Sequence, residues 1–169
     1  MQKWLAMVLL AAFTLGACAT ASTNPATKSA VHAEGKTIFV ARHLQKAEGD
    51  DPPLSDEGTA AAKRLAEMLR SEGISAIFAT PTRRAMETAA PLSRLAGVPI
   101  TQYDPRNPQP LAARIAGGEG SVLVIGHSNT VHHLIALFGG QAPPPLTEQD
   151  YGTVFMIDAK GGVRTVEVD

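Results

Sequence analysis

The sequence predicts a single three-layer α/β domain, with a mostly parallel central sheet and helices on both faces. Short apolar runs rich in β-branched residues alternate along the chain with segments whose apolar residues recur at helical spacing. Such alternation is typical of a parallel sheet. The chain has 169 residues, 44% of them hydrophobic, which is enough for one domain with its own core.

The first predicted strand is "TIFVA" (37–41). Ser55 follows as a candidate N-cap, with Asp56 and Glu57 favourable in the first turn of a helix. The apolar residues of this helix recur every three or four positions until Gly73 ends it, at Ala61, Leu65, Met68 and Leu69.

A second short strand is expected at "AIFA" (76–79). Thr80 is a possible N-cap and Pro81 suits a first helical position, so a helix is expected to start there. Pro91 is a candidate kink within it. Residues 99–103, "PITQY", are a candidate third strand.

The strongest strand pattern is "SVLVIG" (121–126). A helix is expected next, capped by Asn129 and ended by Gly139 and Gly140, with apolar residues at Val131, Leu134, Ile135 and Phe138. The segments 153–158 and 163–168 are expected to form a late antiparallel pair.

The N-terminus has the pattern of an export signal. Gln2 and Lys3 precede an apolar run from Trp4 to Ala17, which is short for a membrane span but fits a signal-peptide core. The run ends in "LGAC" and resembles a bacterial lipoprotein signal, in which Cys18 becomes the lipidated first residue. The alternative is an ordinary signal peptide cut after "ATA" (19–21).

We therefore expect a signal peptide over 1–17, a lipidated Cys18 with a flexible tether over 18–35, and the folded domain over 36–169. Ala19 is not the aspartate associated with inner-membrane retention. The expected location is thus the periplasmic face of the outer membrane, if the host is Gram-negative.

Charge and cysteine content argue against a nucleic-acid-binding protein and against an intrachain disulfide. The chain has 15 Lys and Arg against 16 Asp and Glu, a formal net charge of -1, and no basic run exceeds two residues. A nucleic-acid surface needs a basic stripe, so no nucleic-acid partner is expected. A disulfide within the chain is excluded because Cys18 is the only cysteine.

Basic side chains follow three of the predicted elements. Arg42 and His43 end the first strand, His127 follows the strand 121–126, and Arg84 lies early in the helix after the second strand. Ligands of open α/β sheets bind outside the carboxyl ends of the strands, so these side chains are expected to meet.

Together these residues suit a phosphate ester. Arginine donates in a planar, bidentate manner to phosphate oxygens. A neutral histidine is a competent nucleophile, and neighbouring cations keep it neutral. A second, protonated histidine can stabilise charge on the phosphoryl group.

Four motifs, in this order, resemble the histidine phosphatase superfamily, which has the phosphoglycerate-mutase-like fold. They are "RHLQK" (42–46), "PLSDEGTAAAKRLAEML" (53–69), "TPTRRAMETA" (80–89) and "VIGHSNT" (124–130). The resemblance spans residues 37 to 158. It implies that His43 is the phosphoryl-accepting nucleophile, and that Arg42, Arg84 and His127 complete the phosphate pocket.

The implied function is an exported phosphatase that hydrolyses a small-molecule phosphomonoester through a phosphohistidine on His43. It would need no metal and no cofactor, because the pocket's own cations can stabilise the charge. The alternative is a catalytically weak phosphate-binding or sensor module of the cell envelope. The oligomeric state and the natural substrate are not readable from the sequence.

The sequence departs from the family pattern near the nucleophile. Leu44 replaces a small residue and could narrow the pocket or alter the local backbone; Gln45 stands where many relatives have Glu. The family's usual proton donor is a carboxylate further along the chain. In the corresponding segment Asp104 is the only acid and comes slightly early. Asp104 is therefore the candidate general acid, ahead of Glu87.

Two hydroxyl residues have two possible roles each. Thr88 and Ser128 suit either a local capping role or support of the neighbouring site residues. His132 and His133 are adjacent and lack metal-ligand spacing.

Overall fold

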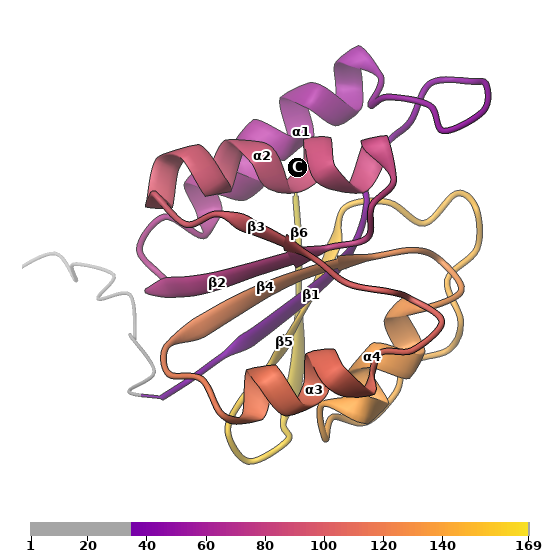
Figure 1. Ribbon diagram of the computed structural model, residues 1–169. Helices are drawn as coiled ribbons and strands as arrows, with labels where there is room; N and C mark the ends of the chain where they lie inside the picture. The colour runs from indigo at the N-terminus through magenta and orange to yellow at the C-terminus, as the bar shows by residue number, and fades with distance from the viewer. Residues whose placement is uncertain (1–34, 169) are drawn as a thin grey trace, which may run out of the picture. The chain divides into compact units, whose positions relative to one another are not determined.

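The computed structural model describes residues 35–168, so the predicted signal peptide, Cys18 and most of the tether lie outside the described residues. Four helices and six strands make up the domain (Figure 1). In chain order they are β1 (Ile38–Arg42), α1 (Asp56–Met68), β2 (Ile74–Ala79), α2 (Arg83–Ala96), β3 (Ile100–Gln102), α3 (Gln109–Ala116), β4 (Ser121–Gly126), α4 (Val131–Leu137), β5 (Thr153–Ile157) and β6 (Val163–Glu167).

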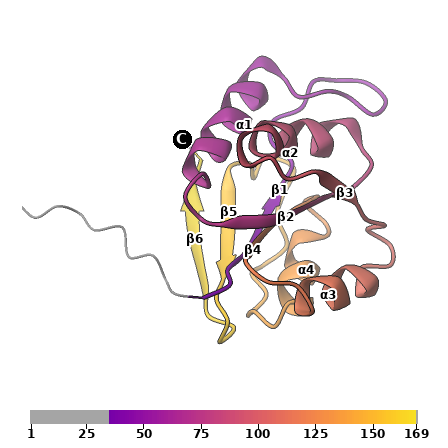
Figure 2. The ribbon, with the colours of Figure 1, turned by 60° about the vertical axis from the view of Figure 1, so that its left-hand side comes forward.

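The sheet has the strand order β3-β2-β4-β1-β5-β6. The strands β1 to β4 pair in parallel, whereas β5 pairs antiparallel with both β1 and β6. Helices α1 and α2 cover one face and α3 and α4 the other, as Figures 1 and 2 show. The predicted three-layer α/β fold and the late antiparallel pair are therefore confirmed.

The core has two halves because the central strands are buried on both faces. All six residues of β4 are buried. Leu123 and Ile125 pack in the cluster that contains the apolar residues of α1 and α2. Val122 and Val124 pack in the cluster of α3 and α4. Successive side chains of a strand point to opposite faces, so one continuous apolar run supplies both halves.

The first helix begins as the sequence predicts. The Ser55 hydroxyl accepts a hydrogen bond from the Gly58 N–H at 3.1 Å, which satisfies one of the free donors of the first turn. The helix ends at Met68, and Gly73 lies in the turn beyond it with φ +63°.

The prediction that Thr80 caps the second helix is wrong. The N-cap of α2 is Thr82, and its side chain makes no capping bond. Asp51 takes that place by accepting the Arg83 N–H at 2.9 Å. The Thr80 hydroxyl is fully buried and turned towards His127 instead. The helix continues through Pro91 to Ala96.

Two further differences concern the second half of the chain. The cap of α4 is Thr130 rather than Asn129. Helix α3 was not expected, because only Leu111 and Ile115 of its residues are buried and prolines crowd its start. Within residues 35–168 no helix is both long and apolar enough to cross a membrane.

Candidate functional site

The predicted pocket residues come together at the carboxyl edge of the parallel strands. Arg84 Nε lies 3.0 Å from His43 Nε2. The rings of His43 and His127 meet edge to face, with centroids 5.3 Å apart. Arg42 ends β1 directly beside Gly126 of β4, the residue before His127. Three strand ends thus deliver these four side chains to one place.

His43 turns an unprotonated ring nitrogen towards this pocket, where it accepts a hydrogen bond from Arg84. Its Nδ1 lies 2.9 Å from the Leu44 carbonyl oxygen, which can only accept, so Nδ1 carries the proton. The other nitrogen, Nε2, is then unprotonated and faces Arg84. Burial lowers the pKa of His43 to about 4; the Leu44 bond opposes this shift, and the cation of Arg84 adds to it. The ring is therefore neutral at neutral pH, as a nucleophile requires.

Backbone contacts hold His43 in this orientation. Its own N–H donates to the Gly126 carbonyl at 3.0 Å. The next residue, Leu44, donates its N–H to the Thr88 hydroxyl at 3.0 Å, and that hydroxyl donates to the Arg84 carbonyl at 2.8 Å. Thr88 therefore supports the site rather than only capping a turn.

The Leu44 side chain does not narrow the pocket. It is 1% exposed and packs in the core cluster below α1 and α2. Gln45 also turns away from the site, since its Nε2 donates to Glu57 at 3.3 Å. Neither departure from the family pattern therefore displaces the four predicted site side chains.

His127 is positioned by two threonines. Its Nε2 lies 2.8 Å from the Thr80 hydroxyl, and its backbone N–H donates to the Thr130 hydroxyl at 2.8 Å. Burial lowers the pKa of His127 to about 4, and the nearby arginines add to this shift. Sequence reasoning missed the role of Thr80 because it assigned that side chain to a helix cap.

Arg42 is enclosed by the loop that precedes β5. Its side chain is 2% exposed. One terminal nitrogen, NH1, donates to the carbonyls of Thr147 at 2.8 Å and Asp150 at 3.2 Å. The other, NH2, contacts the Glu148 carboxylate at 3.0 Å and the Tyr151 hydroxyl at 3.2 Å. The Nε atom is buried and has no hydrogen-bond partner.

Sequence reasoning also missed Glu148 and Tyr151. Because β5 runs against its neighbour β1, its first residue lies at the edge where the parallel strands end. The loop before β5 must then reach the pocket. The Tyr151 ring lies 4.0 Å from the Arg42 guanidinium carbon, a cation–π distance. The predicted antiparallel pair was the signal that could have located this loop.

Asp104, the candidate general acid, lies in an exposed loop after β3. Both of its carboxylate oxygens accept from Arg106, and these bonds lower its pKa. It lines a cavity of about 530 Å³ that Thr80 also borders. Among the described residues, none of its hydrogen bonds reaches the four pocket side chains.

Glu87, the second candidate, faces away from the pocket. Its carboxylate accepts the Leu54 N–H at 2.7 Å and Arg83 Nε at 2.8 Å. These contacts tie the loop before α1 to helix α2. Glu87 is therefore a structural residue in this fold.

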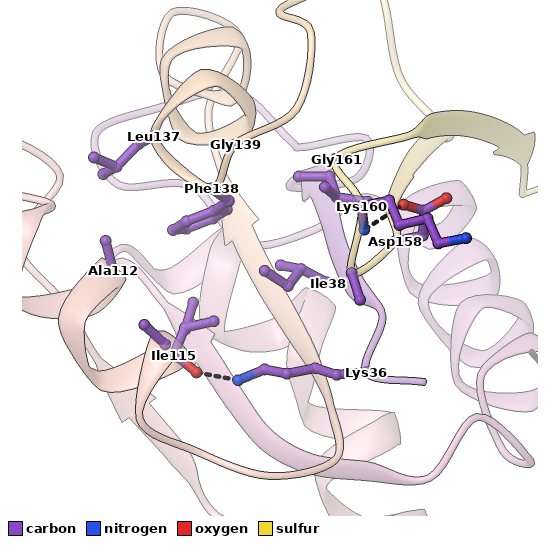
Figure 3. A pocket seen from close by; sticks show the side chains of 13 residues that line it. Lys36, Ile38, Ala112, Ile115, Leu137, Phe138, Gly139, Asp158, Lys160 and Gly161 are labelled. Carbon is purple, nitrogen blue, oxygen red and sulfur yellow. Dashed lines mark hydrogen bonds between the residues drawn. The ribbon is translucent and has the colours of Figure 1, made fainter. Parts of the chain in front are cut away.

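A separate cavity of about 510 Å³ lies at the opposite, amino-terminal edge of the parallel strands (Figure 3). Lys36 closes one side of it by donating to the carbonyls of Ile115 and Gly118. Most of its lining is aliphatic or aromatic, and no histidine or arginine contributes to it. It lacks the groups that the chemistry above requires.

The carboxyl-edge pocket is suited to an anion. It combines two arginines, two neutral histidine rings and a buried, unpartnered N–H of Arg42. Among residues 35–168, no group of three or more His, Cys, Asp or Glu side chains is arranged to hold a metal ion.

Comparisons with known proteins agree with this geometry. The sequence profile of the histidine phosphatase superfamily (branch 1) matches residues 35–105, which include Arg42, His43 and Arg84. No curated protein is significantly similar to this sequence.

Several solved structures share the fold. The protein histidine phosphatase SixA, solved with tungstate, is 21% identical, with a TM-score of 0.59 over 78% of this chain and 97% of its own. A mycobacterial glucosyl-3-phosphoglycerate phosphatase, solved with inorganic phosphate, is 16% identical, with a TM-score of 0.60 over 78% and 95%. A phosphoserine phosphatase from Entamoeba histolytica is 13% identical, with a TM-score of 0.56 over 78% and 95%.

The fold is thus the phosphoglycerate-mutase-like α/β fold that these phosphatases share. The chain covers nearly all of each of them.

Proposed function

We propose that this chain is a histidine phosphatase that hydrolyses a phosphomonoester through a phosphohistidine on His43. The observation that carries the proposal is the state of the His43 ring. Its Nδ1 proton is held by the Leu44 carbonyl, and its unprotonated Nε2 lies 3.0 Å from Arg84 Nε. A phosphoryl oxygen that takes over the Arg84 donor would release the Nε2 lone pair and bring phosphorus next to it.

The neighbouring side chains supply charge stabilisation. Arg84 and Arg42 donate to the non-bridging oxygens of the phosphoryl group, which spread negative charge in the transition state. His127 binds the same group and takes up a proton when the dianion arrives, because a nearby negative charge raises the pKa of a histidine. These cations do the work that a metal ion performs in other phosphatases, so the reaction is proposed to be metal-independent.

The printed names of the structural relatives support the reaction class. SixA is a protein histidine phosphatase, and the mycobacterial relative acts as a glucosyl-3-phosphoglycerate phosphatase. Both names describe removal of a phosphoryl group. We extend only that shared chemistry to this chain, with a small-molecule phosphate ester as the substrate.

The direct test is hydrolysis of an aryl phosphate by the purified protein in the presence of a chelator. We expect turnover without added metal, and none above background for His43→Ala. A rapidly quenched reaction with ³²P-labelled substrate should leave acid-labile label on the wild type alone. Turnover that survives in His43→Ala, or that requires a metal, would contradict the mechanism.

A second candidate function is a phosphate-binding sensor module with little turnover. It is favoured by one observation: NH1 and NH2 of Arg42 are both engaged by the loop before β5. An arginine so engaged is less available to a transition state. Saturable phosphate binding in a calorimeter, with no hydrolysis of a broad phosphoester panel, would support this alternative.

We also propose that the protein is exported and attached to a membrane through lipid on Cys18. The support is the "LGAC" pattern at residues 15–18 and the polar, small-residue segment that follows. A location at the periplasmic face of the outer membrane is the corresponding proposal for a Gram-negative host.

A further inference from the structure

We propose that Glu148 is the acid that protonates the leaving group, an inference that rests on the proposed phosphatase function. Glu148 is a carboxylate in direct contact with the pocket. Its Oε2 lies 3.0 Å from Arg42 NH2, and its Oε1 accepts the Ser128 hydroxyl at 2.6 Å. Both partners neighbour the two pocket histidines in sequence.

The direction of attack places the leaving group near this carboxylate. In an in-line displacement the leaving oxygen departs opposite the attacking nitrogen. His43 is 3% exposed, so the attacking nitrogen lies below the protein surface. The leaving group must therefore project outward to solvent. The Glu148 side chain is 69% exposed, while the Arg42 side chain that it contacts is 2% exposed, so Glu148 reaches from the buried arginine to the solvent.

Other acidic residues fit the role less well. The carboxylate of Asp104 is engaged by Arg106 in its own loop. Asp51 lies 3.6 Å from Arg84, but its Oδ1 accepts the N–H of Arg83 and caps helix α2. Among the acidic residues of the described range 35–168, only Glu148 contacts a proposed phosphate-binding arginine with a side chain that does not also hold a helix or a turn.

Binding of substrate gives Glu148 its proton. In the empty site the Ser128 hydroxyl and the charge of Arg42 hold its pKa below the usual value, so it is ionised. A phosphate dianion that takes over Arg42 NH2 removes one stabilising partner and adds a like charge. Both changes raise the pKa of the Glu148 carboxyl group. A substrate that arrives as the monoanion can then pass its proton to Glu148 and remain bound as the dianion.

The step balances as follows. The lone pair of His43 Nε2 forms a bond to phosphorus, the bond from phosphorus to the leaving oxygen breaks, and its electron pair takes the Glu148 proton to give the alcohol. Water then attacks the phosphohistidine and passes a proton to the Glu148 carboxylate. The phosphorus–nitrogen bond breaks, its pair returns to Nε2, and inorganic phosphate leaves.

The test compares Glu148→Gln with the wild type on an alkyl phosphate and on 4-nitrophenyl phosphate. The amide keeps the size of the side chain but cannot give up a proton to the leaving group. General acid catalysis contributes roughly 10²–10⁴-fold. We expect a loss of that order in kcat/KM for the alkyl ester and a loss below roughly tenfold for the aryl ester, whose leaving group scarcely needs a proton.

A second readout concerns the hydrolysis step. Because Glu148 also accepts the proton of water, Glu148→Gln should accumulate acid-labile phosphoenzyme with the aryl ester. The matched control is Glu67→Gln, which alters a carboxylate paired with an arginine at 3.3 Å on the exposed face of α1. Its kcat/KM should match the wild type on both esters.

Three results would overturn the inference while leaving the phosphatase function intact. One is an equal loss for both esters in Glu148→Gln. Another is a gain on both esters with tighter inhibition by inorganic phosphate, which would make Glu148 a competitor of the substrate. The third is the alkyl-specific loss in Asp104→Asn instead. Absence of turnover by the wild type on either ester would instead refute the proposed function itself.

Discussion

At the scale of single residues, the pocket keeps two histidines uncharged inside the fold. His43 and His127 each have a pKa of about 4, against 6.5 for an exposed ring, and burial is the largest cause in both. Between these values the unfolded chain binds protons that the folded chain does not. The free energy of unfolding must therefore fall as the pH falls from about 6.5 to about 4.

This gives a pH prediction. We expect each ring to lower the free energy of unfolding by about 2 kcal/mol when the pH falls from about 7 to about 5. Urea unfolding of the wild type, His43→Asn and the His43→Asn/His127→Asn double variant at both pH values would measure it. The double variant should lose most of the difference; an unchanged difference would mean that the rings are not the source.

Arg84 provides a second prediction at this scale. Its Nε contacts His43, the proposed nucleophile, at 3.0 Å, and in the proposed mechanism its charge stabilises the phosphoryl group. Arg84→Ala should lower kcat for an aryl phosphate by on the order of 10²–10³. The adjacent Arg83 is a matched control, because its side chain is 60% exposed and pairs with Glu87. Similar losses in Arg83→Ala would count against a specific role for Arg84.

At the scale of elements, helix α2 does more than cover the sheet. Thr88 lies one turn after Arg84, and its hydroxyl joins that residue's carbonyl to the Leu44 N–H of the segment after β1. The carbonyl oxygen of Leu44 in turn accepts a hydrogen bond from His43 Nδ1. The helix therefore sets the position of Arg84 and helps to fix the tautomer of His43, the proposed nucleophile.

The corresponding prediction concerns Thr88→Val, which keeps the shape of the side chain and removes the hydroxyl. The Leu44 N–H would be left buried without an acceptor, at a cost of about 1–3 kcal/mol. We expect that loss in urea unfolding together with a lower kcat. Thr88→Ser restores the hydroxyl and should recover most of both. Full activity and stability in Thr88→Val would show that the bond is dispensable.

At the scale of the whole molecule, the proposed lipid anchor makes a prediction about location. Full-length protein should fractionate with membranes, and Cys18→Ser should be released because it offers no thiol for lipidation. Immunoblots of the membrane and soluble fractions would show this. A variant that stays with the membrane and is processed normally would refute the lipoprotein signal.

Much of the fold follows from local sequence. The strands β1, β4 and β5 lie close to their predicted positions because their runs are mostly apolar and rich in β-branched residues. Strand β6 has no apolar run, but three of its five residues are β-branched. The Ser55 cap was readable because a cap depends on residues three apart. Helix α3 could not be predicted in this way, because only two of its eight side chains are buried and its apolar pattern is weak.

By itself the sequence determined the α/β class. It also predicted Arg42, His43, Arg84 and His127 as site residues, because each directly follows or opens a predictable element, and the structure brings these four side chains together. The tertiary structure alone decided what surrounds them. Glu148 lies 106 residues from Arg42 along the chain, and the two meet only because β5 pairs antiparallel beside β1. Contacts of that kind depend on strand order and loop path, which local patterns do not encode.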